Sequence, residues 1–336
     1  MKNQKHLLPV VDRYFKANLH THSTISDGKL SPAEVKEAYK SKGYQILALT
    51  DHKVIVDHSH MTEPDFLMLT GIEVNYNDTQ TKPGYYLKTY HLNLIAKRPD
   101  NLWTPVKPAP SYLNSHAYFP LENYEEMDTC YDPESVNAMI ARANEMGFLV
   151  MYNHPTWSGQ RYPEYAPLKG LWGMELRNSE CCLLGHNENN TRVFTDLLNL
   201  GNKVFPLGTD DLHQIRALGL SWIMVGAQEL RYDSVIDALE KGDFYMSCGP
   251  EIHSLTLEDN ILRISCSDAQ HILLETHSRF ARRAQAVDGA YLREAEFDLT
   301  KLFEQSGDIP EAYFRLTVTA PDGTYAATRG YYLQEL

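Results

Sequence analysis

A strand, helix, strand unit near the start of the chain constrains the fold most. Between the apolar segments "FKANLHTH" and "QILALTDH" lies a helix with both ends marked in the sequence. Ser31 is a good N-cap, Pro32 fits the first turn, Glu34 completes a capping box, and Gly43 stops the helix. The continuous apolar run of "QILALTDH" is typical of a parallel strand that is buried on both faces. The unit therefore predicts a parallel α/β sheet.

The same pattern continues to about residue 250. The apolar runs "FLVMYNHP" and "VFPLGTDDLH" follow a predicted helix at "DPESVNAMIARANEMG" and another around "NTRVFTDLLNLG". About seven strands separated mostly by helices favour a closed (β/α) barrel over an open doubly wound sheet. The interval from about 97 to 131 is rich in Pro, Asn and Tyr and is too long for an ordinary connection, so we expect an insertion or lid there.

The pattern changes after Gly249 and Pro250. In "AYFRLTVTAPDGTY" the apolar residues Phe314, Leu316 and Val318 alternate with polar ones, and "PDG" indicates a turn between two strands. This pattern predicts a small antiparallel β-sandwich-like domain. We therefore expect a barrel domain over residues 1–250 and a C-terminal β domain over residues 251–336.

The charge balance and the cysteines exclude several classes of protein. With 31 Lys and Arg against 44 Asp and Glu, the net charge is −13, which argues against duplex nucleic acid or a membrane surface as a partner. The five cysteines show no CxxC spacing, so we expect neither a disulfide framework nor a thiolate zinc site. No apolar segment has the length of a signal peptide or membrane span, which predicts a cytoplasmic protein. The sequence leaves the oligomeric state open.

Imidazoles and carboxylates recur where the predicted strands end. The residues at these ends are His20, His22, Asp51, His52, Glu73, His154, Asp210, Asp211 and His213. The carboxyl ends of parallel strands in a barrel lie on one face, and gathering carboxylates there is costly without cations. Imidazole and carboxylate donors without thiolate suit Zn, Mn or Fe, and Mg²⁺ is also compatible. We therefore expect a site for two or three divalent metal ions.

The ordered motifs carry a family resemblance. "HTHSTISDG", "TDH", "GIEV", "HLN", "NHP" and "DDLH", in this order over residues 20 to 213, resemble the PHP (polymerase and histidinol phosphatase) family of metal-dependent phosphoesterases. The resemblance covers about residues 14–250 and implies a distorted seven-stranded, TIM-like barrel with a trinuclear metal site. The implied ligand sets are His20, His22, Glu73 and Asp211; Glu73, His91 and His154; and Asp27, His52 and His213. Of the doublet, Asp211 rather than Asp210 fits the family's Asp-x-His pattern.

The predicted activity is hydrolysis of a phosphate ester by a metal-bridging hydroxide, with His22, Asp211 and His213 as the catalytic residues. We expect a small phosphorylated metabolite or a nucleotide as substrate, and the end of an oligonucleotide also fits. Arg177, Arg216 and His186 are the candidates for holding the substrate, because guanidinium groups match phosphate oxygens and His186 lies in a loop.

Two other hypotheses stay open. An amidohydrolase-type barrel that hydrolyses a C–N bond also begins with His-x-His on a first strand. A non-catalytic module could keep the metal ions for stability and use the C-terminal sheet to bind a partner. Turnover of amides instead of phosphates would favour the first, and bound metal without any turnover would favour the second.

Overall fold

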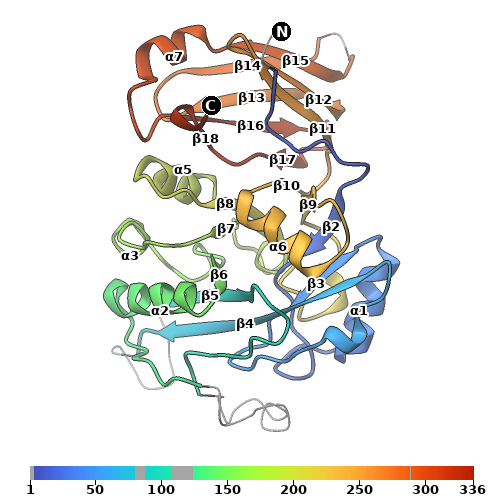
Figure 1. Cartoon of the computed structure of the whole chain (residues 1–336), viewed down its shortest axis with the longest axis vertical. Helices are drawn as coiled ribbons and strands as arrows, with labels where there is room; N and C mark the ends of the chain where they lie inside the picture. The colour runs from blue at the N-terminus through green and yellow to red at the C-terminus, as the bar shows by residue number, and fades with distance from the viewer. Residues whose placement is uncertain (1–3, 80–87, 108–123, 288) are drawn as a thin grey trace.

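The computed structural model describes residues 4–79, 88–107, 124–287 and 289–336 (Figure 1). Its larger sheet is mixed and has the strand order β14-β13-β16-β17-β10-β9-β2-β3-β4-β5-β6-β7-β8. The strands that follow the predicted barrel region are β2 (Phe15–Asn18), β3 (Ile46–Leu49), β4 (Leu67–Asn77), β5 (Thr89–Ala96), β6 (Phe148–Tyr152), β7 (Gly173–Asn178), β8 (Phe205–Thr209), β9 (Trp222–Val225) and β10 (Phe244–Ser247). The predicted α/β class is confirmed.

The direction of these strands is more varied than the sequence predicts. The pairs β2–β3, β3–β4, β6–β7 and β7–β8 are parallel, whereas β5 is antiparallel to both β4 and β6, and β9 is antiparallel to β2. Two backbone hydrogen bonds connect the segments after β2 and β8, from Asp211 N to His20 O and from His22 N to Leu212 O, each 3.0 Å. No strand pairing in the described part closes the sheet. The seven-stranded barrel is therefore not confirmed.

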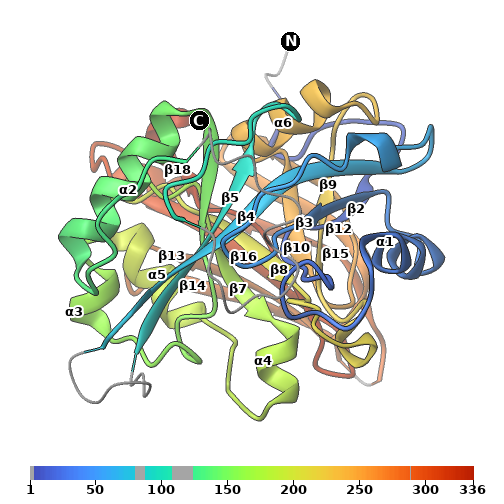
Figure 2. The ribbon, with the colours of Figure 1, turned by 90° about the horizontal axis from the view of Figure 1, so that it is seen from below.

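The helices lie outside these strands (Figure 2). Their bounds are α1 (Pro32–Ser41), α2 (Pro133–Glu145), α3 (Tyr162–Tyr165), α4 (Ser179–Leu183), α5 (Thr191–Asn199), α6 (Tyr232–Lys241) and α7 (Thr300–Ser306). The predicted capping box of α1 is present, because Ser31 Oγ accepts from Glu34 N and Glu34 bonds back to Ser31 N. Asp132 caps α2 by accepting from Ser135 N at 2.8 Å. Among the described residues, no helix has the length and apolar character needed to cross a membrane.

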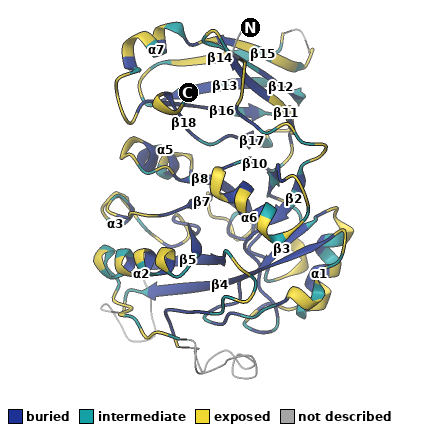
Figure 3. Cartoon of the chain, in the orientation of Figure 1, coloured by how far each residue is buried: buried dark blue, intermediate teal, exposed yellow. Residues whose placement is uncertain are grey.

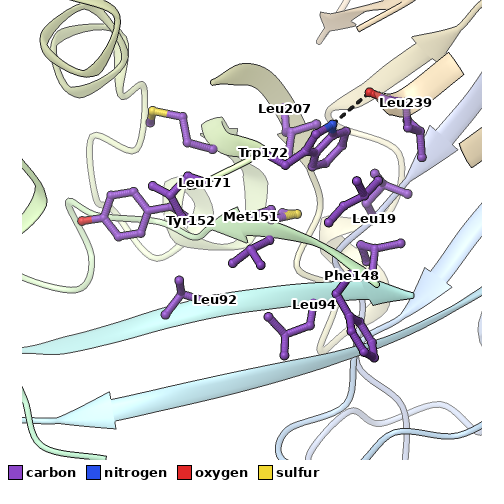
Figure 4. Close-up of a cluster of buried hydrophobic side chains, with 14 of the residues drawn as sticks. Leu19, Leu92, Leu94, Phe148, Met151, Tyr152, Leu171, Trp172, Leu207 and Leu239 are labelled. Carbon is purple, nitrogen blue, oxygen red and sulfur yellow. Dashed lines mark hydrogen bonds between the residues drawn. The ribbon is translucent and has the colours of Figure 1, made fainter. Parts of the chain in front are cut away.

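A large apolar core fills the space between strands and helices. The strands are buried and the outer faces of the helices are exposed (Figure 3). Leu92, Leu94, Phe148 and Leu207 belong to this core, and Trp172 Nε1 donates to Leu239 O at 2.9 Å within it (Figure 4). Because these residues fix the strands against each other, the polar residues at the strand ends are held on a rigid base.

The C-terminal part consists of two antiparallel sheets around a second core, in the upper part of Figure 1. β11 (Ile252–Glu258), β12 (Ile261–Ala269) and β15 (Leu292–Asp298) join β1 (Lys5–His6); β13 (His271–Thr276), β14 (Ala281–Gln285), β16 (Tyr313–Thr319), β17 (Tyr325–Ala327) and β18 (Tyr331–Tyr332) extend the larger sheet. Phe314, Leu316 and Val318 are buried, as their alternation predicts. Because β17 pairs with β10, the larger sheet continues from one part into the other.

Two predictions about domain organisation stay predictions. The boundary near residue 250 is one, since β10 and β17 share a sheet across it. The other is the insertion or lid over about 97–131, because residues 108–123 lie outside the described residues. Of its described flank, the Trp103 ring packs against Phe148 with ring centroids 5.7 Å apart. That flank is therefore anchored on the core.

Candidate metal centre

The carboxylate of Glu73, in β4, lies among five imidazole rings. Its oxygens are 2.9 Å from His91 Nδ1, 3.0 Å from His52 Nδ1, 3.3 Å from His20 Nε2, and 3.4 Å from the Nε2 atoms of His22 and His154. Glu73 is 1% exposed. Burial acts to raise the pKa of this carboxyl group, but the imidazoles, those of His91 and His20 first, hold it well below its usual range. Glu73 is thus an anionic centre that several nitrogen donors share.

The strand directions explain how these residues meet. His20 and His22 follow β2, and His52 follows β3. His91 comes at the start of β5, yet β5 is antiparallel, so this start lies beside the carboxyl end of β4, with His91 opposite Asn75. An antiparallel strand thereby brings its amino-terminal residues to the edge where its neighbours end.

Asp211 is a second carboxylate close to His20 and His22. Its Oδ1 is 3.1 Å from the Nε2 atoms of both His20 and His22, and these two nitrogens are 3.2 Å apart. Asp211 has φ +50° and His154 has φ +23°, a backbone region that costs non-glycine residues about 1–3 kcal/mol. The surrounding fold therefore holds both side chains in place against backbone strain.

A third group lies nearer the solvent. Asp27 Oδ1 is 3.4 Å from His213 Nε2 and 3.6 Å from His22 Nδ1, and its Oδ2 is 3.7 Å from His52 Nε2. Burial acts to lower the pKa of His213, but its hydrogen bond to Asp27 and the charge of Asp211 raise it to about 9. Burial, with His213 and His52 nearby, lowers the pKa of His22 to about 3. The two rings therefore differ in proton affinity although they stack 4.1 Å apart.

All nine predicted metal ligands lie in these groups. Their ligand atoms fall within 4.8 Å of one another in four sets: His22, Asp27, His52 and His213; His20, His22 and Glu73; His20, His154 and Asp211; and His52, Glu73 and His91. Imidazole nitrogens and carboxylate oxygens at this spacing fit divalent metal ions. The number and identity of the ions, and the division into three sites, stay predictions.

The two aspartates of the doublet, Asp210 and Asp211, have different surroundings. Asp210 is fully buried, and its carboxylate accepts from the backbone N–H groups of Gly219, Leu220 and Ser221 at 2.7, 2.9 and 3.0 Å. It therefore fixes the loop between β8 and β9, whereas Asp211 faces the histidines. Asp51 has a similar structural role, since it accepts from the backbone and hydroxyl groups of Ser23 and Ser26.

The sequence analysis missed Glu175, a fully buried carboxylate in β7. Its Oε1 lies 2.6 Å from His20 Nδ1, and its Oε2 accepts from His154 N at 2.7 Å. A carboxylate on Nδ1 holds the proton there and leaves Nε2 of His20 available to an ion. The signal available in the sequence is one carboxylate inside the apolar run "GMELRN".

The three predicted substrate-binding residues are placed differently. A cavity of about 320 Å³ opens over the metal ligands, and Arg216 lines it, with Nη2 2.6 Å from Glu180 Oε1. Arg177 is not among the lining residues and donates to Asn189 Oδ1 at 2.8 Å, beyond an irregularity of register between Glu175 and Arg177. His186 is exposed and does not line the cavity either.

Gly28 gives a test of how the Asp27 loop is held. A Cβ at Gly28 would lie 2.6 Å from the carbonyl carbon and oxygen of His22 and 2.7 Å from Ser23 N. We expect Gly28→Ala to push Asp27 away from its partners and to lower turnover by about 100-fold, the cost of a displacement near 1 Å. Gly323→Ala is the control. A Cβ there meets nothing within 4 Å, and although the positive φ of +85° strains the turn locally, it lies away from the ligands, so the variant should keep its activity. Equal activity of the two variants would contradict this role.

The sequence comparisons agree with this geometry. Residues 18–127 match the PHP domain. The chain is 39% identical over 66 residues to a 5′-3′ exoribonuclease of Haemophilus influenzae, and this match covers 18% of this chain and 24% of that protein. It is 57% identical over 37 residues to the DNA polymerase/3′-5′ exonuclease PolX of Bacillus subtilis, and this match covers 11% of this chain and 6% of that protein. The chain thus spans a quarter or less of these relatives.

Three solved structures of other proteins align with this chain at low sequence identity. A two-domain protein from Bacteroides vulgatus that contains a predicted PHP-like metal-dependent phosphoesterase has 16% identity, a TM-score of 0.45, and coverage of 98% of this chain and 99% of that chain. An amidohydrolase from Chromobacterium violaceum has 15% identity and a TM-score of 0.39, and the alignment covers 59% of this chain and 87% of that chain. A lesion-specific endonuclease from Pyrococcus furiosus has 14% identity and a TM-score of 0.41, and the alignment covers 68% of this chain and 56% of that chain.

These three TM-scores lie below 0.5, so the assignment rests on the matched segment. That segment holds six of the nine predicted ligands, from His20 to His91, and the remaining three meet them in space. The match supports the prediction of a hydrolytic enzyme. The resemblance to the PHP family that the sequence predicts is thus confirmed for residues 18–127.

Proposed function

We propose that the protein hydrolyses a phosphate ester with the help of divalent metal ions. The observation that carries the proposal is the cluster of five imidazoles around buried Glu73, together with Asp211 and Asp27, beside a cavity of about 320 Å³. The trinuclear arrangement and the seven-stranded barrel belong to the same proposal. Bound dications would supply Lewis-acid chemistry, making water more acidic and offsetting charge on phosphoryl oxygens.

The residues around the ions would hold protons in defined places. Glu175 keeps a proton on Nδ1 of His20, and the carbonyl oxygen of Asp211 accepts from Nδ1 of His213 at 2.9 Å. His213 therefore presents Nε2 to the cavity, where it could protonate the leaving oxygen. A metal ion bound by Asp27, His52 and His213 would compete with that proton, so the number of ions decides which role His213 takes.

Arg216 is the residue we propose for holding a phosphate oxygen. It lines the cavity, and its side chain is 46% exposed although one nitrogen pairs with Glu180. A guanidinium group has five N–H donors, so the remaining ones can reach a substrate phosphate without breaking that pair. Arg177 and His186 lie outside the cavity lining and would need to move to take part.

The cavity and the charge favour a small substrate. A volume of 320 Å³ is at the low end for small-molecule sites, and the net charge of −13 disfavours a long duplex. A small phosphorylated metabolite or a nucleotide fits best. Because two curated relatives are named as exonucleases, the end of an oligonucleotide also belongs in the test.

The test is phosphate release by protein loaded in turn with Zn²⁺, Mn²⁺, Fe²⁺ and Mg²⁺, against mononucleotides, sugar phosphates and short oligonucleotides. We expect release from at least one class, and loss of at least 100-fold in His22→Ala and Asp211→Ala. Both variants should keep the circular dichroism spectrum of the parent. Equal activity in these variants would remove the proposed site. Turnover of amides alone would favour the C–N hydrolase, and bound metal without turnover would favour the binding module.

A further inference from the structure

The cavity has apolar lining residues as well as the metal ligands. Trp157 and Leu184, which we call its apolar wall, are 38% and 53% exposed, and the buried Cys181 also lines the cavity. Large apolar side chains that stay exposed beside a polar site commonly mark a surface for a ligand. The question is which ligand group this wall would contact.

Trp157 stands directly beside two of the proposed metal ligands. The centroid of its indole is 4.9 Å from that of His154 and 5.5 Å from that of His91, and both pairs are close to perpendicular, at 83° and 66°. A phosphate held over those ligands would therefore place its organic group within reach of the indole. The alkyl side chain of Leu184 shares the same cavity.

The backbone of Trp157 is fixed by a buried acid. Glu188 is fully buried, and its two oxygens accept from Thr156 N at 3.0 Å and Trp157 N at 2.7 Å. Asn190 holds Glu188 in turn, donating from Nδ2 at 2.9 Å. The indole is thus offered on a pre-organised loop, which lowers the entropic cost of contact with a ligand.

An aromatic ring is the group that such a wall recognises best. Stacking of a flat base on an aromatic side chain contributes about 1–3 kcal/mol. A sugar or a short polyol offers Trp157 and Leu184 only small C–H surfaces between hydroxyl groups, so it should gain less. The cavity of about 320 Å³ has room for one ring beside a phosphate, and not for a long chain of nucleotides.

We propose that Trp157 is a specificity-determining residue that stacks on an aromatic ring of the substrate, with Leu184 beside it. The substrate would then be a phosphate ester whose organic group carries a flat heterocycle, such as a nucleobase. This inference rests on the proposed phosphoesterase function, since it takes the phosphate to lie over the metal ligands.

The test measures binding separately from turnover. The probes are adenosine 5′-phosphate and ribose 5-phosphate, together with the phosphonate analogue of each, in which a carbon replaces the ester oxygen so that hydrolysis is blocked. Calorimetry on the Mn²⁺-loaded protein should show the adenosine phosphonate binding about 10- to 100-fold more tightly than the ribose phosphonate. In Trp157→Ala this preference should fall to about onefold, and Trp157→Phe should restore most of it.

Tyr162→Ala is the matched control, because Tyr162 is an aromatic residue that is 50% exposed and does not line the cavity. Its preference should equal that of the parent. A preference near onefold in the parent, or one that Trp157→Ala leaves intact, would overturn the stacking role. If the binding preference depends on Trp157 but neither ester releases phosphate, the stacking site stands and the proposed hydrolysis of these esters fails.

Discussion

Glu73→Gln is expected to remove most of the bound metal and, with it, turnover. The substitution keeps the shape of the side chain but removes the negative charge that five imidazoles share, and its amide N–H groups would point at ring nitrogens. Neutralising a ligand at the centre of the cluster should cost more than the 10- to 100-fold seen for residues that only orient ligands. We therefore expect at least 100-fold loss of turnover and less than half of the parent's metal content, measured by elemental analysis.

Glu304→Gln is the matched control for this change. Glu304 is exposed on α7, far from the histidines, and its substitution by Gln changes the net charge by the same amount as Glu73→Gln. Its metal content and turnover should equal those of the parent. Retention of metal in Glu73→Gln, in protein that has the parent's circular dichroism spectrum, would contradict the central place of Glu73.

The two neighbouring aspartates should separate stability from metal binding. Asp210→Ala leaves three backbone N–H groups without their acceptor, that of Ser221 buried and those of Gly219 and Leu220 partly buried. Each such loss costs about 1–3 kcal/mol, so the free energy of unfolding should fall by about 3 kcal/mol or more. At roughly 2–4 °C per kcal/mol, Tm measured with a chelator should fall by about 10 °C. The folded fraction should still bind metal.

Asp211→Ala should behave in the opposite way. Its carboxylate faces His20 and His22 at 3.1 Å, so its loss removes a proposed ligand and lowers metal content and turnover. Alanine keeps the backbone at φ +50°. Without metal, the substitution removes one side-chain hydrogen bond, from Asn178 Nδ2 at 3.1 Å, so Tm in chelator should stay within a few degrees of the parent. If Asp210→Ala loses the metal while Asp211→Ala keeps it, the assignment of the doublet is reversed.

The sequence predicts the local elements well because their signals are local. The caps at Ser31 and Asp132 depend on side chains within three residues of the helix start, and both are present. The alternation around Phe314 predicts one buried face of an antiparallel strand, and in β16 Phe314, Leu316 and Val318 are buried. Arg315 between them is buried as well, against the pattern, and it pairs with Glu275 at 2.8 Å. The sequence does not predict the direction of β5, because an apolar run such as "YHLNLIA" has the same pattern whether its neighbouring strands are parallel or antiparallel.

The candidate site shows the same division between local and distant signals. Histidines at strand ends are visible in the sequence, and the structure brings them together. The role of Glu175 is not visible in the sequence, because it depends on the side chain of His20, 155 residues away, and the backbone N–H of His154, 21 residues away. Asp210 and Asp211 look alike in sequence, and only the positive φ of Asp211 and the loop after β8 turn them to different partners.

The central claim is that these imidazoles and carboxylates hold divalent ions in common. Its most direct test is a crystal structure of the metal-loaded protein with anomalous diffraction at the absorption edge of the ion, supported by elemental analysis of the same sample. We predict two or three anomalous peaks within about 2.0–2.3 Å of the side chains of Glu73, His20 and Asp211 and their neighbours. Peaks elsewhere, or none in protein that elemental analysis shows to contain metal, would contradict the account.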